Sequence, residues 1–376
     1  MTNSKIIHQW VEYFEDIGIK DEYIEEYRDI IQNLSKNNVP VIFEIEHLSK
    51  LVGINVPTLY SMIFCSEKFY RSFEIAQKNG KNRTITTPFK SLKLVQTWIY
   101  KNILKQGYIH KSAHGFVKKR SIKSNANLHK NSNVFLQLDI KNFFPSIPLS
   151  WIVNYFNKLG YSKKISFYLA KLCCYQDCLG QGAPTSPALS NLVFFALDKR
   201  LLNYATQNNI IYSRYADDMV FSGAEVTLNF KNFVIHLIKK YGFKVNSKKT
   251  KLKINANQNI ITGIQIKNSM LFVPKKYKRE LSKDLYYIRK FGIVSHVSKK
   301  RIKDPNYIYS LLGKVNFVLS IESNNSEYLE YKRELENILH ILIQMDTEWH
   351  LLLDNDSYLT WTLFFTFNLT MLTSLS

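Results

Sequence analysis

Residues 210–222 of the chain read IIYSRYADDMVFS. Two short apolar runs, 210–213 and 219–221, flank the tetrapeptide Tyr215-Ala216-Asp217-Asp218, and short runs of β-branched and aromatic residues predict strands. The sequence therefore predicts a tight hairpin with two carboxylates at its tip. Aspartate is common in ordinary turns, so the pair needs a further partner before it indicates chemistry.

A third carboxylate stands at the end of another predicted strand. The run 134–138, VFLQL, leads directly into Asp139. Carboxylates that converge from neighbouring strands are the hard oxygen ligands that Mg²⁺ prefers. Nucleotidyl transfer needs two such ions about 4 Å apart, one at the attacking hydroxyl and one at the departing pyrophosphate. We predict that Asp139, Asp217 and Asp218 are catalytic and hold two Mg²⁺ ions.

The charge balance indicates a polyanionic partner. The 376 residues include 51 lysines and arginines against 30 acidic residues, which gives a formal net charge of +21. So large an excess indicates that the partner is a nucleic acid, since a charge that only keeps the protein soluble would be smaller. A membrane is a weaker candidate, because the sequence has no basic amphipathic helix beside an apolar anchor. The 45% content of hydrophobic residues excludes global disorder.

Neither secretion nor zinc binding is predicted. Residues 1–5 lack the apolar core of a secretion signal, so we expect a cytoplasmic protein. Four cysteines make no disulfide framework. Cys173, Cys174 and Cys178 cluster, but no second pair supplies a fourth zinc ligand, and the apolar run beside them predicts a buried helix face.

The hydrophobic pattern divides the chain into four parts. Residues 1–72 have helical spacing and predict a helical N-terminal extension. Residues 73–273 alternate strands and helices and open with a hairpin at Lys78-Asn79-Gly80-Lys81. Helices follow over 274–350, and the tail 351–376, largely uncharged, predicts a docked element or a partner-binding segment rather than a membrane span.

The second part has the pattern of an α+β domain. Its predicted helices include 149–159, 162–176 and 228–240, and its later strands are predicted near 243–246, 250–254, 259–266 and 270–273.

Four motifs, in this order and spacing, resemble those of reverse transcriptases. Besides residues 215–218 they are 138–147 (LDIKNFFPSI), 181–187 (QGAPTSP) and 246–250 (NSKKT). The resemblance covers roughly residues 75–320. It implies a right-hand polymerase with fingers and palm over 73–273 and a thumb over 274–350.

Two further strings resemble retron reverse transcriptases in particular. They are Asn125-Ala126-Asn127-Leu128-His129 and Ile261-Thr262-Gly263. The resemblance implies an RNA-directed DNA polymerase that copies part of a structured non-coding RNA into multicopy single-stranded DNA. It also implies priming from the 2′-hydroxyl of an internal guanosine and a partner effector protein in defence against phage.

The motifs assign candidate roles around deoxynucleoside triphosphates. Asp139 and Asp217 should bridge the metals together with the carbonyl of Ile140, with Asp218 in or near the metal shell. Phe144 is either a ring that excludes the ribose 2′-hydroxyl or plain core packing. Further candidates for binding the nucleotide are Gln181 and Gly182 beneath the base, Arg83 and Lys81 at the phosphates, and Lys248 or Lys249 as the acid that protonates pyrophosphate.

Candidate contacts to nucleic acid lie on both sides of the palm motifs. Basic residues interleaved with aromatic residues suit a surface that follows a duplex, although a solvated amphipathic face is the competing interpretation. The candidates are Asn125, His129, Lys118, Lys119, Arg120, Lys275, Lys276, Lys278, Arg279, Tyr286 and Arg289. For His129 a structural role is the alternative.

Two rival functions stay open from the sequence. The nearest rival is another prokaryotic reverse transcriptase, either a defence-associated enzyme without a retron RNA or a group II intron type. The element at 125–129 argues against both. The other rival is an RNA-binding scaffold or antitoxin that restrains a toxic partner. The complete set Asp139, Asp217 and Asp218 favours retained chemistry.

Overall fold

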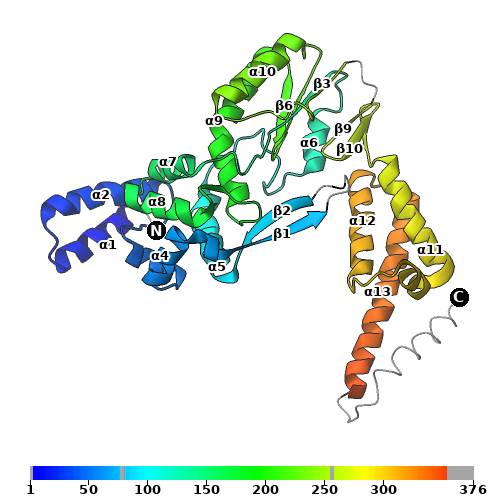
Figure 1. The fold of residues 1–376 in the computed structure, drawn as a ribbon, viewed down its shortest axis with the longest axis horizontal. Helices are drawn as coiled ribbons and strands as arrows, with labels where there is room; N and C mark the ends of the chain where they lie inside the picture. Colours follow the sequence, from blue (N-terminus) through cyan, green and yellow to red (C-terminus); the bar gives the residue numbers. More distant parts are fainter. Residues whose placement is uncertain (1–2, 77–79, 81, 255–257, 354–376) are drawn as a thin grey trace. The chain divides into compact units, whose positions relative to one another are not determined.

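The computed structural model describes residues 3–76, 80, 82–254 and 258–353, with the side chains of 3–6, 83 and 345–353 excepted. The chain forms two compact units, Met1–Ala256 and Asn257–Ser376 (Figure 1). Both mix helices and strands, as expected for an α+β protein. No helix among the described residues is both long and apolar enough to cross a bilayer.

Unit 1 begins with four helices, α1 (Asn3–Asp16), α2 (Asp21–Lys36), α3 (Ile45–Val52) and α4 (Val56–Phe64). Aromatic rings of α1 and α2 pack around Phe43, with the centroids of Trp10 and Tyr27 at 5.4 and 4.9 Å from it. The Asn55 side chain caps the first turn of α4 by accepting from the N–H of Thr58. The predicted helical extension is therefore confirmed as helical.

This helical segment is anchored to the rest of unit 1. The side chain of Asn37 donates to the carbonyl of Leu159 at 3.1 Å, and the hydroxyl of Tyr161 donates to the carbonyl of Pro40 at 2.9 Å. One hydrophobic core runs from Leu34 to Phe243. The N-terminal helices therefore share a core with the following α+β segment.

A two-stranded hairpin follows. Strands β1 (Tyr70–Ala76) and β2 (Asn82–Pro88) pair antiparallel, with Tyr70 opposite Pro88 and Ala76 opposite Asn82. Gly80 at the turn has a φ of +76°, which glycine adopts without a Cβ penalty. Helix α5 (Lys90–Asn102) comes next and buries Leu92, Val95 and Ile99 on one stripe.

The central sheet has the order β6-β7-β3-β8, all antiparallel. Its strands are β3 (Phe135–Asp139), β6 (Ile211–Tyr215), β7 (Asp218–Ser222) and β8 (Lys251–Lys253). Both the strand ending at Asp139 and the predicted hairpin around residues 215–218 are confirmed. The short pair β4 (Cys174–Tyr175) and β5 (Cys178–Leu179) lies outside this sheet.

Further helices belong to unit 1. They are α6 (Ile122–Leu128), α7 (Leu149–Leu159), α8 (Lys163–Cys173), α9 (Ser186–Gln207) and α10 (Leu228–Lys240), with short 3₁₀ turns η1 (Ser66–Phe69) and η2 (Leu104–Gln106). The predicted bounds of α7 and α10 are confirmed. The predicted strand at 243–246 is wrong, because only Val245 pairs, in an isolated bridge to Ile140.

Unit 2 opens with a small antiparallel sheet, β9 (Gln258–Ile261), β10 (Ile264–Lys267) and β11 (Met270–Phe272). The single strand predicted over 259–266 is wrong, since Thr262 and Gly263, both with positive φ, turn the chain back on itself. Helices α11 (Lys275–Lys300), α12 (Tyr307–Ile321) and α13 (Ser326–Leu353) follow, and α11 is kinked at Gly292.

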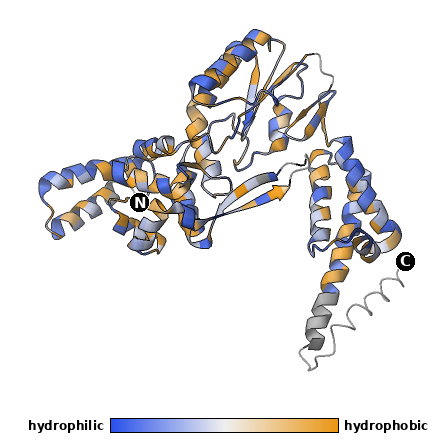
Figure 2. Cartoon of the chain, in the orientation of Figure 1, coloured by the Kyte–Doolittle hydropathy of each residue, from blue (hydrophilic) through white to orange (hydrophobic). Residues whose placement is uncertain are grey.

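Amphipathic helices occur in both units, and Figure 2 shows blue and orange segments alternating along them. On α11 the residues Leu281, Leu285 and Ile288 are buried at helical spacing. The last 23 residues, 354–376, which hold most of the predicted tail, lie outside the described part of the chain.

The anchoring of the N-terminal helices can be tested at Gly160. It ends α7 with a φ of +108°, and a Cβ there would lie 2.8 Å from the Cβ of Asn33. We expect Gly160→Ala to lower the free energy of unfolding by about 2 kcal/mol or more, from left-handed strain plus overpacking. Chemical denaturation measures this loss.

The matched control is Gly53→Ala. Gly53 ends α3 with a φ of +69°, and nothing lies within 4 Å of a Cβ built there. Gly53→Ala should lower the free energy of unfolding by about 1 kcal/mol, from strain alone. Equal losses for the two variants would contradict a close contact between α2 and the end of α7.

Candidate active site

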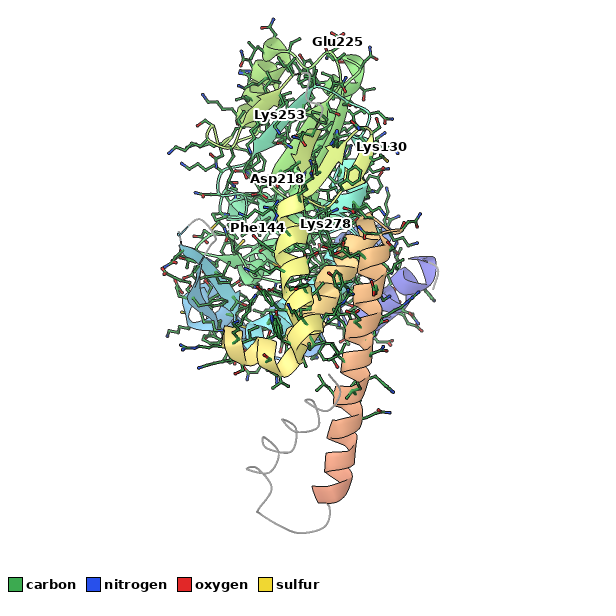
Figure 3. All side chains as sticks on the ribbon, turned by 90° about the vertical axis from the view of Figure 1, so that its right-hand side faces the viewer. Lys130, Phe144, Asp218, Glu225, Lys253 and Lys278 are labelled. Carbon is green, nitrogen blue, oxygen red and sulfur yellow. The ribbon has the colours of Figure 1, made fainter. Side chains whose placement is uncertain are left out.

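Strand pairing brings the three predicted carboxylates to one edge of the central sheet. Asp139, the last residue of β3, lies opposite Asp218, the first residue of β7. The N–H of Ile140 donates to the carbonyl of Asp217 at 3.1 Å, which fastens the end of β3 to the hairpin turn. Figure 3 labels Asp218 on this unit together with Phe144.

The carboxylate of Asp139 is held by the segment that follows α10. One oxygen accepts from the side-chain amide of Asn246 at 3.1 Å, and the other lies 2.7 Å from Nζ of Lys249. The N–H of Asn246 also donates to the carbonyl of Asp139 at 2.8 Å. Lys248 and Lys249 are both exposed, and the contact with Asp139 is what distinguishes Lys249.

The carboxylates at this edge influence one another electrostatically. Partial burial, followed by the charges of Asp217 and Asp139, raises the pKa of Asp218 to about 6, although its side chain still reaches solvent. The hydrogen bond to Asp139 raises the pKa of Lys249, which keeps its ammonium protonated. One ammonium thus faces three carboxylates.

These residues fit a hard divalent cation in donor type. They offer carboxylate oxygens at one place, and their mutual repulsion is what a cation relieves. In the described part of the chain no three His, Cys, Asp or Glu side chains are already gathered as a metal-binding group. The carboxylate of Asp139 instead contacts Lys249 and Asn246.

The motif at 181–187 lies against the hairpin β1–β2. The N–H of Thr86 on β2 donates to the carbonyl of Gln181 at 3.1 Å. Gly182 has a φ of +111°, and a Cβ there would lie 2.9 Å from the carbonyl oxygen of Thr86. Only glycine fits so close an approach of two backbones. Lys81 lies outside the described residues, and of Arg83 only its backbone pairing with Ile75 is described.

Phe144 is partly buried beside other rings. Its centroid lies 5.5 Å from that of Phe143 and 6.1 Å from that of Phe116. Phe116 is 47% exposed and has a φ of +62°, unusual for a bulky residue. The ring of Phe144 therefore keeps an open side while its base packs on the core.

The element at 125–129 requires a correction. Asn125 and His129 are fully buried, and the two ring nitrogens of His129 each lie 2.7 Å from a serine hydroxyl, of Ser222 and of Ser213. Ser213 in turn donates to Asn125 at 2.6 Å. Burial lowers the pKa of His129 to about 3, so its ring is neutral. Both residues join α6 to strands β6 and β7, and their burial leaves neither side chain accessible to nucleic acid.

The basic loop before α6 divides in two. Lys118 and Lys119 are exposed. Arg120 turns inward, where its Nη1 donates to the carbonyls of His110 at 2.9 Å, Lys111 at 3.2 Å and Ala113 at 2.5 Å. The predicted nucleic-acid contact of Arg120 is corrected accordingly, because its guanidinium shapes the loop.

The basic residues of α11 divide in the same way. Lys275, Lys276, Arg279 and Tyr286 are exposed. Lys278 instead pairs with Glu322 at 2.8 Å, and the same carboxylate accepts from the N–H of Val273. Arg289 pairs with Glu334 at 2.7 Å and lies over the ring of Tyr331. Lys278 thus holds α11 to the end of α12, which corrects its predicted role. Arg289 is 41% exposed, and its predicted contact with nucleic acid stays a prediction.

Sequence reasoning missed three residues of this site. Asn246 was read only as part of a motif, although it holds Asp139. Arg214 and Asp198 form a fully buried ion pair at 2.6 Å beside the hairpin turn. The sequence gives little signal for them, since Asp198 follows an apolar run but stands directly before Lys199 and Arg200.

Known proteins share these features. The family described as reverse transcriptase (RNA-dependent DNA polymerase) matches residues 75–278. The Escherichia coli retron Ec86 reverse transcriptase is 32% identical over 82% of this chain and 92% of its own length. The Myxococcus xanthus retron Mx65 reverse transcriptase is 30% identical over 65% of this chain and 63% of its own length.

A solved structure of telomerase from Candida albicans aligns over 71% of this chain and 63% of its own, with 10% identity and a TM-score of 0.43. So loose a likeness adds nothing to the family assignment.

The repulsion at Asp218 predicts that removing its charge stabilises the folded state, by an amount that depends on pH. A carboxyl whose pKa is raised on folding favours the folded state while protonated, and this stability is lost as the pH rises through about 6. In metal-free buffer, Asp218→Asn should therefore raise Tm above the wild-type value near pH 8. The advantage should shrink as the pH falls below about 6.

Thermal melts across this pH range, with chelator present, measure the difference. Glu225→Gln is the control, because Glu225 is an exposed carboxylate soon after the same strand. A lower Tm for Asp218→Asn at pH 8, or a difference that does not change with pH, would contradict the crowding of the carboxylates.

Proposed function

The chain belongs to the retron reverse transcriptases, which are RNA-directed DNA polymerases, and from this premise we propose the reaction that it performs. It copies part of a structured non-coding RNA into multicopy single-stranded DNA and primes from a 2′-hydroxyl of that RNA. The observation that carries the proposal is the pairing of Asp139 with Asp218 beside Asp217 at one sheet edge. The buried element at 125–129, next to the same hairpin, supports it.

The proposed cofactor is a pair of Mg²⁺ ions, held by Asp139, Asp217 and the carbonyl of Ile140, with Asp218 in or near the shell. When bound, they activate the attacking hydroxyl and neutralise the leaving pyrophosphate. The crowding of carboxylates that raises the pKa of Asp218 supports this assignment.

Lys249 is the proposed proton donor to the departing pyrophosphate. Its raised pKa keeps a proton on Nζ, and its contact with Asp139 keeps that proton at the reacting edge. Lys248 shares the motif, but the contact with Asp139 is made by Lys249.

The remaining contacts to the nucleotide are proposed from the positions of these residues in the motifs. Phe144 blocks the ribose 2′-hydroxyl with the open side of its ring and so selects deoxynucleotides. Gln181 and Gly182 support the base, and the absence of a side chain at Gly182 lets this segment lie close against Thr86 of β2. Arg83, with Lys81 as a weaker candidate, binds the triphosphate from β2.

The proposed contacts to template and product are the exposed basic residues. They are Lys118 and Lys119 in unit 1 and Lys275, Lys276, Arg279 and Tyr286 on α11 in unit 2. Their cations suit phosphates, and the 51% exposed ring of Tyr286 suits a sugar or an unpaired base.

The setting is proposed to be antiviral defence in the cytoplasm, with an effector protein as partner. Four free cysteines fit a reducing compartment. In this setting DNA synthesis and restraint of the effector can coexist.

The decisive experiment expresses the chain with its flanking genomic sequence and extracts total nucleic acid. We expect a short DNA linked to RNA, whose mobility shifts after treatment with RNase or debranching enzyme. Asp217→Asn combined with Asp218→Asn should abolish the band. A band that survives this double substitution excludes the proposed site, and phage protection without any wild-type band favours the scaffold function instead.

The two lysines give a matched pair of variants. Lys249→Ala should lower the rate of single deoxynucleotide incorporation by on the order of 100-fold, since general acids contribute that much or more. Lys248→Ala should remain close to the wild-type rate. Single-turnover primer extension measures both, and equal losses would contradict the assignment of Lys249.

A further inference from the structure

The turn that presents Asp217 and Asp218 has a strained backbone. Ala216 has a φ of +56°, in the left-handed region that residues with a side chain seldom adopt. Such a conformation costs on the order of 1 kcal/mol and persists only where neighbours fix it. The surroundings of Ala216 should therefore contain groups that hold this conformation.

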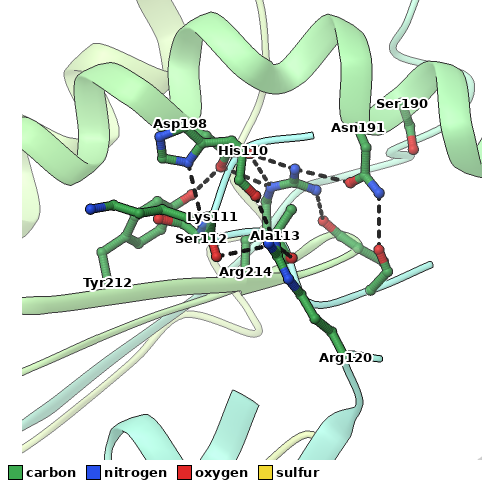
Figure 4. A network of polar contacts seen from close by, with 12 residues as sticks. His110, Lys111, Ser112, Ala113, Arg120, Ser190, Asn191, Asp198, Tyr212 and Arg214 are labelled. Carbon is green, nitrogen blue, oxygen red and sulfur yellow. Dashed lines mark hydrogen bonds and ion pairs between the residues drawn. The ribbon is translucent and has the colours of Figure 1, made fainter. Parts of the chain in front are cut away.

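One such group is the guanidinium of Arg214. Its Nη1 donates to the carbonyl of Ala216 at 2.9 Å. Its Nε and Nη2 donate to the carboxylate of Asp198 on α9, at 3.0 and 2.6 Å, and Nη2 also reaches the side-chain oxygen of Asn191 at 3.1 Å. Figure 4 shows Asp198 and Asn191 on either side of Arg214. The planar fork thus fixes the turn relative to helix α9.

The loop before α6 closes the opposite side of Ala216. A Cβ on Gly115 would lie 2.5 Å from the nitrogen of Ala216, so only glycine fits there. Asn191 donates to the carbonyl of Gly115 at 2.9 Å. The loop also pairs with β6, since the N–H of His114 donates to the carbonyl of Arg214 at 2.6 Å and the N–H of Arg214 donates to Ser112 at 2.7 Å.

General stability is a poor explanation for this arrangement. Arg214, Asp198 and Asn191 are all fully buried. A buried ion pair loses its hydration, and apolar residues of similar volume often stabilise a core equally well. What an apolar replacement cannot do is bind the carbonyl of Ala216 and α9 at once. Because the pair lies directly beside the turn, its role is to align the turn.

We propose that Arg214, Asp198 and Asn191 act as an internal clamp, closed by Gly115, that positions the turn bearing Asp217 and Asp218 for catalysis. These are positioning residues, since all three side chains are fully buried and act through the turn. The proposal rests on the catalytic role proposed for the two aspartates. Misplacing reacting groups by about 1 Å can cost on the order of 100-fold in rate.

Two variants test the clamp from its two sides. Arg214→Lys keeps a cation beside Asp198 but cannot reach Asp198, Asn191 and Ala216 together. Gly115→Ala leaves the ion pair in place and pushes on the nitrogen of Ala216. The control is Tyr212→Phe, which removes the 2.7 Å hydrogen bond from Tyr212 to Asp198 without touching the turn.

The measurement is single-turnover incorporation of one deoxynucleotide on an RNA template annealed to a DNA primer, alongside Tm. We expect the maximal rate to fall on the order of 10- to 100-fold in Arg214→Lys and Gly115→Ala, while Tyr212→Phe stays within about threefold. The apparent nucleotide affinity and the template–primer affinity should stay close to wild type in all three variants, because the side chains of the clamp are fully buried.

The clamp is wrong if folded Arg214→Lys keeps the wild-type maximal rate, or if rate and Tm fall in proportion across the three variants. Should Arg214→Lys fail to fold, Gly115→Ala decides alone, and a wild-type rate there overturns the proposal. A wild-type chain that extends no primer would contradict the catalytic role of Asp217 and Asp218, and the clamp with it.

Discussion

The site depends on the antiparallel register between β3 and β7, which sets Asp139 opposite Asp218. Slipping one strand by a single residue would turn each of its side chains to the other face of the sheet. Strand β3 is buried on both faces, since Phe135 and Leu136 are both about 1% exposed or less, so alternation of polar and apolar residues cannot fix this register. Hydrogen bonds at the C-terminal end of the strand fix it instead, from Ile140 to Asp217 and from Asn246 to Asp139.

Much of this arrangement could be predicted from local sequence. An apolar run that ends in an acidic residue predicts a strand with a carboxylate at its edge, and Asp139 follows that rule. The hairpin at 210–222 follows it too, because its two runs are short and its turn is polar. The bounds of α7 and α10 were equally accessible, since their periodicity and capping are local properties.

What could not be predicted depends on partners far away in the chain. His129 bonds to Ser222, 93 residues later, and Lys278 pairs with Glu322, 44 residues later. Both look like surface polar groups in the sequence, because a buried partner leaves no local signal. The choice between Lys248 and Lys249 could not be predicted for the same reason. It depends on which of the two contacts Asp139, which lies 110 residues before Lys249.

The same long-range contacts explain how the site tolerates its own instability. The carboxylates repel one another, Ala216 is strained, and a charge pair is buried beside them. Each feature works against folding, and sites of function are where such features gather. Around them lie short hydrogen bonds to β6, to α9 and to the segment after α10, each from a different part of unit 1. Since those elements share one hydrophobic core, the free energy of folding the whole core opposes relaxation of the turn. Moving the turn that bears Asp217 and Asp218 away from Asp139 would thus require the core to repack.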